Sequence, residues 1–135
     1  MIEKNLVFAG KRKTSIAKAT IKKGSGKVTI NRRPINLFPM LQQLELKEPL
    51  VIAKDVLGKL DFDIAVNVKG GGNSSRIEAS RLAIARAIVG FSKSDKLRRA
   101  YLAYDRNLLV ADTRRKEPYK PEDSKARAKR QSSKR

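Results

Sequence analysis

The chain has 135 residues, and its 32 Lys and Arg residues outnumber its 13 Asp and Glu residues, for a formal net charge of +19. Charge repulsion on this scale opposes compaction unless a polyanion neutralises it, so we expect the partner to be a nucleic acid. The sequence contains neither Cys nor His, which excludes disulfides and the usual zinc sites and removes the commonest general base at neutral pH. We therefore expect no metal, no cofactor and no enzymatic activity.

Membrane association is not expected either. The sequence has no apolar run of spanning length and no long basic amphipathic helix. The first ten residues, MIEKNLVFAG, include an acid and only a short apolar stretch, which is typical of neither a signal peptide nor a transit peptide. We expect the protein to stay in the compartment where it is made.

The first third of the chain predicts β-strands. Residues 14–22, TSIAKATIK, alternate between apolar and polar side chains, as a half-buried strand does. Residues 27–31, KVTIN, continue the alternation after a Gly-Ser-Gly turn, so we expect these two strands to pair as a hairpin. Residues 6–9 predict a further strand before them.

Two helices and another strand are predicted next. Residues 36–45 carry Leu and Met at helical spacing. Residues 49–57 begin with Pro49, which suits a first helical turn, and end before Gly58. Residues 62–69, FDIAVNVK, have the cleanest strand alternation in the chain.

The last predicted elements are two helices and a tail. Ser75 and Glu78 have capping-box spacing, which predicts a helix over residues 76–89, and a second helix is predicted over residues 95–104. No Val, Ile, Leu, Phe or Met follows Val110. We therefore expect an α+β body over residues 1–110 and an extended basic tail over residues 111–135.

The tail is the first candidate binding site. Half of its last twelve residues are Lys or Arg and none is acidic, which favours an arm that orders along phosphates over a merely solubilising extension. The tail residues that we predict to bind RNA are Arg114, Arg115, Lys116, Lys125, Arg127, Lys129 and Arg130.

A second basic surface is predicted near the N-terminus. Lys11, Arg12 and Lys13 are three consecutive cations between apolar stretches, more than the protection of an edge strand requires. We expect them to form one positive, phosphate-binding surface with the basic residues of the predicted hairpin. Those residues are Lys22, Lys23, Lys27, Arg32 and Arg33.

The third candidate is a glycine loop, GGGNSS, between the strand over residues 62–69 and the next helix. Backbone N–H groups at a helix N-terminus can cradle phosphate, so Gly70, Gly71 and Gly72 are candidate contacts. The loop lacks the Gly-Lys-Ser/Thr ending of a P-loop and has no acidic cluster for magnesium, which favours RNA phosphate over ATP. A tight turn without a ligand and a small phosphotransferase are the alternatives.

The helix after the glycine loop carries Arg76, Arg81 and Arg86. We predict RNA contacts for Arg76 and Arg81. The alternative is structural, because an arginine stem can pack along apolar surface while its head stays in water.

Three motifs, in this order, resemble ribosomal protein S-nine, the ninth protein of the small ribosomal subunit. They are GKRKTSIAKATIKKGSGKVTINRRPI, GGGNSSRIEASRLAIARAIV and the terminal Ser-Lys-Arg. The resemblance implies a mainly four-stranded sheet with helices packed on one side, similar to the second domain of ribosomal protein S-five. It also implies a cytoplasmic, ribosomal location, with small-subunit rRNA of the head and neighbouring small-subunit proteins as partners.

The resemblance further implies that the tail end contacts peptidyl-site tRNA, which assigns Lys134 and Arg135 to tRNA binding. The stretch over residues 105–130 is longer and richer in Pro than the bacterial form and resembles archaeal or eukaryotic members. Family members commonly have Gln where Arg76 stands, and bacterial members usually have Phe where Ser132 stands. A DNA-compacting protein is a further alternative, since net charge alone favours it.

Overall fold

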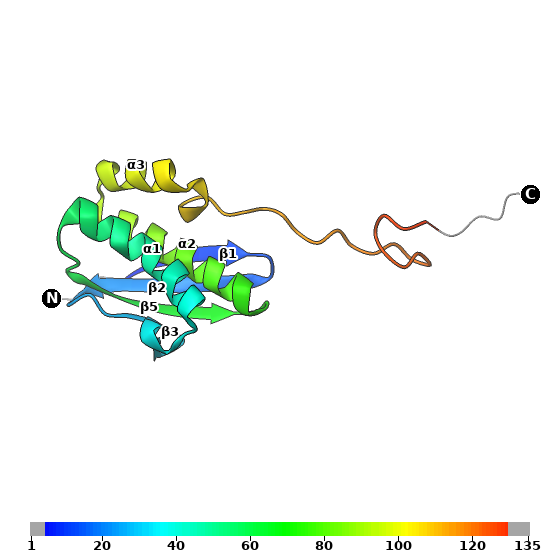
Figure 1. Ribbon diagram of the computed structural model, residues 1–135, viewed down its shortest axis with the longest axis horizontal. Coiled ribbons are helices and arrows are strands. Elements are labelled where there is room, and N and C mark those ends of the chain that lie inside the picture. The colour runs from blue at the N-terminus through cyan, green and yellow to red at the C-terminus, as the bar shows by residue number, and fades with distance from the viewer. Residues whose placement is uncertain (1–4, 130–135) are drawn as a thin grey trace, which may run out of the picture.

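The computed structural model describes residues 5–129, and within them the fold is α+β, as predicted (Figure 1). This part of the chain contains a five-stranded sheet and three α-helices. The elements in chain order are β1 (Leu6–Arg12), β2 (Ser15–Lys23), β3 (Val28–Ile30), β4 (Arg33–Pro34), α1 (Met40–Leu57), β5 (Phe62–Lys69), α2 (Asn73–Ser92) and α3 (Asp95–Tyr104). Short 3-10 helices span Ile35–Leu37 and Arg106–Leu108.

The strands lie in the order β1-β2-β5-β3-β4. The predicted hairpin between β2 and β3 is wrong, because β5 lies between them, antiparallel to β2 and parallel to β3. The segment that leaves β2 crosses the start of β5, where the Asp63 carboxylate accepts hydrogen bonds from the backbone N–H groups of Ser25 and Lys27, both at 2.9 Å. These hydrogen bonds also lower the pKa of Asp63, and the one from Lys27 has the largest effect.

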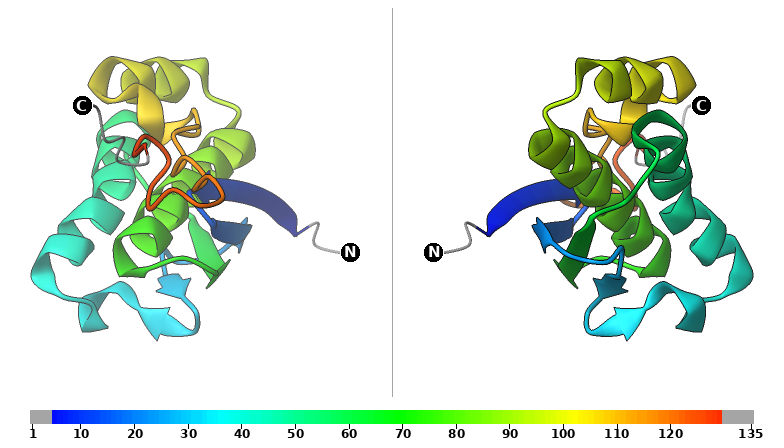
Figure 2. Two further views of the ribbon diagram at one scale, coloured as in Figure 1. Left: turned by 90° about the vertical axis from the view of Figure 1, so that its right-hand side faces the viewer. Right: turned by 90° about the vertical axis from the view of Figure 1, so that its left-hand side faces the viewer.

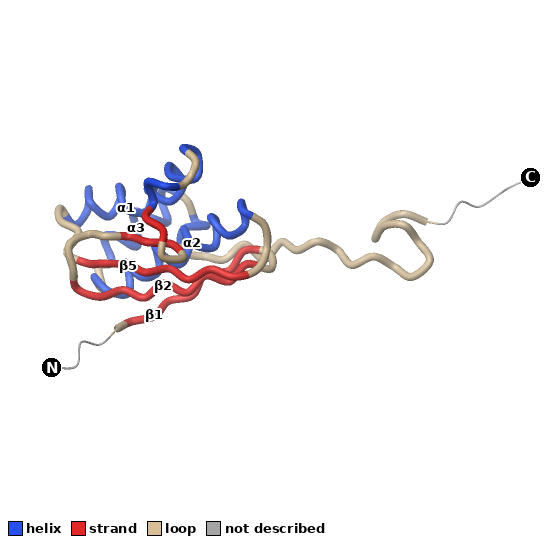
Figure 3. The backbone as a smooth tube through the Cα atoms, turned by 90° about the horizontal axis from the view of Figure 1, so that it is seen from below, coloured by secondary structure: helices blue, strands red, loops and turns tan. Residues whose placement is uncertain are grey.

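The helices cover one face of the sheet, as the resemblance implies, and α1 and β1 lie on opposite sides of the molecule (Figure 2). The core is formed by alternate residues of β2 and β5 and by the inner face of α2. Its buried members include Ala17, Ala19, Ile21, Ile64, Val66, Val68, Ile77, Ile84 and Ile88. The strands form one layer (Figure 3), and their other alternate residues are exposed on the opposite, open face. The strand beyond the expected four is β4, which has two residues.

A single helix, α1, replaces the two helices that were predicted between residues 36 and 57. Pro49 lies inside α1 and does not begin a new helix. Its ring is buried, and its carbonyl oxygen accepts a hydrogen bond from the Tyr101 hydroxyl at 2.7 Å. Contacts with α3 therefore stabilise a helix that the missing proline N–H would weaken.

Residues 111–129 contain neither helix nor strand and run away from the body (Figure 1). The division of the chain at residue 110 stays a prediction. A lipid bilayer could not be spanned by any helix in the described part of the chain.

Candidate nucleic-acid interface

The predicted cluster at residues 11–13 lies at the tight turn between β1 and β2. Arg12 pairs with Ser15 across the turn, so Lys13 and Thr14 are its two central residues. Lys13 has a left-handed φ of 52°, as hairpin turns of this length commonly need. Lys11 and Lys13 are exposed, whereas the Arg12 side chain is only 14% exposed. Two of the three predicted cations are therefore open to a ligand, and the third is turned inward.

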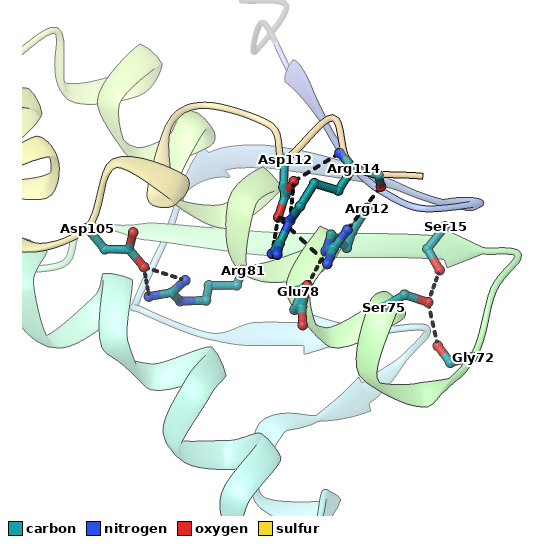
Figure 4. A network of polar contacts seen from close by, with 9 residues as sticks. All are labelled: Arg12, Ser15, Gly72, Ser75, Glu78, Arg81, Asp105, Asp112 and Arg114. Atoms are coloured by element: carbon teal, nitrogen blue, oxygen red, sulfur yellow. Dashed lines mark hydrogen bonds and ion pairs between the residues drawn. The ribbon is translucent and has the colours of Figure 1, made fainter. Parts of the chain in front are cut away.

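Arg12 joins three parts of the chain (Figure 4). Its Nε donates to the Glu78 carboxylate on α2 at 2.5 Å, and its Nη1 donates to the carbonyl oxygen of Arg114 at 3.4 Å. Its Nη2 lies 3.7 Å from the carboxylate of Asp112, which also accepts from Arg114 at 2.7 Å. The planar fork of a guanidinium allows one side chain to hold the turn, α2 and the tail base together.

The carboxyl group of Asp112 reports on this network. Hydrogen bonds from Arg114, together with the charges of Arg114 and Arg12, lower the pKa of Asp112 from 3.8 to about 2. Because the pKa of Asp112 is lower in the folded chain than in the unfolded chain, the contacts of its carboxylate stabilise the tail base at pH values above about 4. This stabilisation is lost as the pH falls from about 4 to about 2.

We expect Arg114→Ala to raise the pKa of Asp112 back towards its ordinary value, because the largest cause of the shift is removed. NMR titration of the side-chain carboxyl measures this. Arg127→Ala, further along the tail, is the matched control and should leave the pKa of Asp112 where it is. An Asp112 pKa that does not respond to Arg114→Ala contradicts the described contacts.

The turn and the tail base line one cationic groove of about 630 Å3. The residues that line it are Arg12, Lys13, Thr14, Arg114, Arg115 and Lys116. Five of these six are cations and none is acidic, although Arg12 and Arg114 are 102 positions apart in the chain. Arg12 and Arg114 are paired with carboxylates, but Lys13, Arg115 and Lys116 form no ion pair within residues 5–129. An open surface with three unpaired cations suits the repeated charges of a phosphodiester backbone.

Two of the three glycines after β5 are required by the fold. Gly70 has a φ of 79° and Gly71 a φ of 65°, in the region that favours glycine. A Cβ at Gly71 would lie 2.1 Å from Oγ of Ser15, and one at Gly70 would lie 2.6 Å from the carbonyl oxygen of Thr14. Gly72 differs, because its φ is −91° and no atom lies within 4 Å of a Cβ built there. Packing within the described chain does not require glycine at this position.

The N-terminus of α2 has Gly72 as its N-cap and no side-chain cap. The predicted capping box is wrong. The Ser75 hydroxyl lies inside the first turn, 3.0 Å from the carbonyl oxygen of Gly72 and 2.8 Å from the hydroxyl of Ser15, while Glu78 binds Arg12 (Figure 4). No acidic residue lies in the first turn, so the N–H groups at this positive helix end remain available to an anion.

A hollow of about 360 Å3 beside this helix end is lined by Arg33 and Arg76 among other residues. Nε of Arg76 donates to the carbonyl oxygen of Gly70 at 2.9 Å in an exposed hydrogen bond. Arg33 and Arg76 thus lie together beside the glycine loop. The sequence places Arg76 next to this loop but did not indicate that Arg33 is its neighbour.

Arg81 and Arg86 make intramolecular contacts. Arg81 forms ion pairs with Glu48 of α1 and with Asp105, the latter at 3.2 Å. Arg86 donates to two backbone carbonyl oxygens, of Ala9 at 2.9 Å and of residue 109 at 3.0 Å. Both contacts agree with the structural interpretation that the sequence left open. RNA binding by Arg81 stays a prediction, and its guanidinium is already paired with two carboxylates.

The expectation that residues 11–13 share one surface with Lys22, Lys23 and Lys27 is wrong. β2 runs from Ser15, at the turn, to Lys23, which pairs with Phe62 at the other end of β5. Eight residue steps of about 3.3 Å separate these ends by roughly 26 Å. Lys22, Lys23 and Lys27 therefore lie at the far end of the sheet. Their binding to RNA stays a prediction, on a separate surface.

Arg32 and Arg33 lie at the glycine-loop end. The Asn31 side chain before them exchanges two hydrogen bonds with the backbone of Val68, at 2.9 and 3.2 Å, near the end of β5. One hairpin surface was expected for all these cations, but the insertion of β5 between β2 and β3 divides them into two groups.

Two further lysines join the candidate interface. Lys18 and Lys69 line a groove of about 550 Å3 on the open face of the sheet, which Gly70 also lines. The sequence contained a signal for both lysines, because each occupies an outward position in a strand that alternates between apolar and polar residues. Only the pairing of β2 with β5 brings them together.

The predicted tail contacts within the described residues are exposed. Lys125, Arg127 and Lys129 face solvent, and Arg127 forms an exposed ion pair with Glu117 at 2.9 Å. An exposed pair of this kind contributes little stability and can yield to phosphate. Arg130, Lys134 and Arg135 lie outside the described residues.

Comparison with known proteins identifies one family and close relatives. Residues 10–135 match the family described as ribosomal protein S9/S16. A protein of Methanococcus vannielii described as small ribosomal subunit protein uS9 is 46% identical over 127 residues, covering 92% of this chain and 93% of its own. Proteins of the same description from Methanococcus maripaludis strain C7 and Picrophilus torridus are 48% and 47% identical. They cover 92% and 95% of this chain, and 93% and 96% of their own.

Proposed function

Because this chain belongs to the ribosomal protein S9/S16 family, we propose that it is a structural, non-catalytic constituent of the small ribosomal subunit. It works in the cytoplasmic ribosome during translation. Its relatives are archaeal, in agreement with the type of tail that the sequence indicates. In the subunit it binds rRNA of the head and reaches the peptidyl-site tRNA with the end of its tail.

The observation that carries the rRNA part of the proposal is the cationic groove between the β1–β2 turn and the tail base. Each phosphate that a Lys or Arg neutralises there releases condensed counterions, which favours binding. Lys13, Arg115 and Lys116 are exposed and supply the phosphate contacts. Arg12 holds the groove together by its contacts with Glu78 and Asp112.

The glycine loop supplies a second phosphate contact. The uncapped end of α2 offers backbone N–H groups, and the absence of a side chain at Gly72 lets an RNA backbone approach them. Arg33 and Arg76 lie beside the same helix end. A phosphotransferase is disfavoured, because the loop lacks the Lys of a P-loop. Within residues 5–129, no three His, Cys, Asp or Glu side chains gather where they could hold a metal ion.

Deletion of Lys134 and Arg135 tests both parts of the proposal. We expect the shortened chain to enter small subunits as well as the full chain does, because the groove and the glycine loop are intact. We expect those subunits to retain peptidyl-site tRNA roughly tenfold less well, since two charge-assisted contacts are lost. Co-sedimentation measures the first result and filter binding of labelled tRNA the second.

A matched control replaces Lys93 and Lys96 on the body by Gln, which removes the same amount of charge. Both lysines are exposed and neither lines the interface. Failure of the full chain to co-sediment with small subunits would contradict the rRNA role. A shortened chain that no longer enters the subunit, or that holds tRNA as well as the full chain, would contradict the role of the tail end.

A further inference from the structure

The solvent-facing side of α1 and the turn before it carry a row of exposed apolar side chains. Leu37 is 72% exposed, Met40 and Leu41 are 76% exposed each, Leu44 is 53% and Val51 is 57% exposed. Met40, Leu44 and Val51 are four and seven positions apart, so they share one face of the helix, with Leu41 beside them. The opposite face of α1 packs on α2 and α3. This row, the apolar stripe, has no covering element in residues 5–129.

The edge of α1 next to the apolar stripe is acidic. The helix contains three acids, Glu45, Glu48 and Asp55, and two lysines, in a chain with 32 basic and 13 acidic residues. Glu45 and Glu48 follow Leu41 and Leu44 by four positions, so each lies directly beside the stripe. Both also line a hollow of about 340 Å3 in which five acids face four cations. This edge of the stripe is therefore acidic, whereas the exposed Lys47 and Lys54 lie along its other edge.

RNA does not suit this surface. Carboxylates repel phosphates, and exposed aliphatic side chains neutralise no charge. A second copy of the chain is disfavoured too, because two molecules of charge +19 repel each other. The chemistry that fits is an apolar segment with basic side chains, which buries the stripe and pairs with the acids.

We propose that the apolar stripe of α1 docks a basic segment of another protein of the small ribosomal subunit. The partner's apolar side chains lie on Leu41 and Leu44, and a Lys or Arg side chain of the partner faces Glu45, since Glu48 is already paired with Arg81. This inference rests on the proposed function, which puts the chain among other RNA-binding proteins. Those proteins carry basic segments for the same reason that this one does, namely the neutralisation of phosphates.

The Glu45→Lys variant distinguishes a basic protein from RNA as the occupant. Glu45 makes no ion pair within residues 5–129, so the fold does not depend on its charge. In competition with the wild-type chain for entry into small subunits, we expect Glu45→Lys to be incorporated about tenfold less. The exposed Asp61→Lys variant makes the same charge change in the loop after α1 and should not be incorporated less. Equal or higher incorporation of Glu45→Lys overturns the proposal, and higher incorporation assigns the helix to RNA.

A photo-crosslinking amino acid at position 41 identifies the occupant directly. In irradiated small subunits we expect a nuclease-resistant adduct with another subunit protein. The same group at Lys69, on the open face of the sheet, should give an adduct with RNA. An adduct at position 41 with RNA, with the chain's own tail or with a second copy, or no adduct, overturns the docking proposal. These results require only that the wild-type chain co-sediments with small subunits, and failure of that step overturns the proposed function itself.

Discussion

Raising the salt concentration from 50 to 200 mM is expected to weaken binding of this protein to small-subunit rRNA about a thousandfold or more. The reason is counterion release. Roughly six to ten phosphate contacts are expected from a chain with this charge distribution, and each contact contributes to the slope of log affinity against log salt. Filter binding or fluorescence anisotropy with a head-domain rRNA fragment, at four or five salt concentrations, measures the slope.

The cationic groove should account for part of this slope. Lys13→Gln with Arg115→Gln removes two exposed cations that line the groove and make no ion pair in residues 5–129. We expect the slope to fall by about two, since each lost phosphate contact lowers it by about one. Lys93→Gln with Lys96→Gln removes the same charge elsewhere and should change the slope far less. Equal slopes for the two double variants would contradict a phosphate site in the groove.

The same assay separates ribosomal RNA from DNA as the partner. Unlabelled duplex DNA should compete far less well than the unlabelled rRNA fragment at equal nucleotide concentration, because the proposed surface reads folded RNA by shape and phosphate position. Equal competition would favour the DNA-compacting alternative, for which charge alone is sufficient.

Alanine at Gly71 and at Gly72 is expected to separate the folding role of the glycine loop from its binding role. Gly71→Ala should lower the free energy of unfolding by about 2–4 kcal/mol, because it puts a side chain at positive φ and drives a Cβ against the Ser15 hydroxyl. Gly72→Ala should lower the free energy of unfolding by no more than about 1 kcal/mol, because alanine is a poorer N-cap than glycine but the backbone is extended and the space beside it is open. Urea denaturation measures both changes.

RNA binding should show the opposite order among folded proteins. A methyl group at Gly72 stands where a phosphate would approach the N–H groups of α2, so we expect Gly72→Ala to weaken rRNA binding about tenfold. Gly71→Ala, measured where it is still folded, should bind within a few-fold of the wild-type chain. If Gly72→Ala binds rRNA normally, the phosphate contact proposed for this loop is wrong.

Local pattern was sufficient to predict most of the secondary structure. The alternation in β2 and β5 and the helical spacing in α3 are properties of neighbouring residues, and each element was found where it was expected. Apart from the short strand β4, the main misses are long-range. Pro49 suggested a new helix, but burial against α3 keeps it inside α1. Ser75 and Glu78 have the spacing of a capping box, but Ser15 and Arg12 bind them instead.

For the candidate site, too, local features were predicted and long-range contacts were not. Residue type and clustering indicated cations, a glycine loop and a polyanionic partner. They did not indicate that Arg12 and Arg81 are engaged by carboxylates, or that the first basic cluster and the tail base share a groove. No spacing rule relates residues a hundred positions apart, so only the packed structure could show which cations remain free.

The sequence by itself predicted a polyanionic partner and determined the positions of the longer elements and the absence of Val, Ile, Leu, Phe and Met after Val110, because composition and short-range periodicity are local properties of the chain. The tertiary structure decided the rest. The insertion of β5 between β2 and β3 sends Lys22 and Lys23 to one end of the sheet and leaves Lys13 beside the tail at the other. Strand order depends on which faces can be buried together, and that is a property of the whole chain.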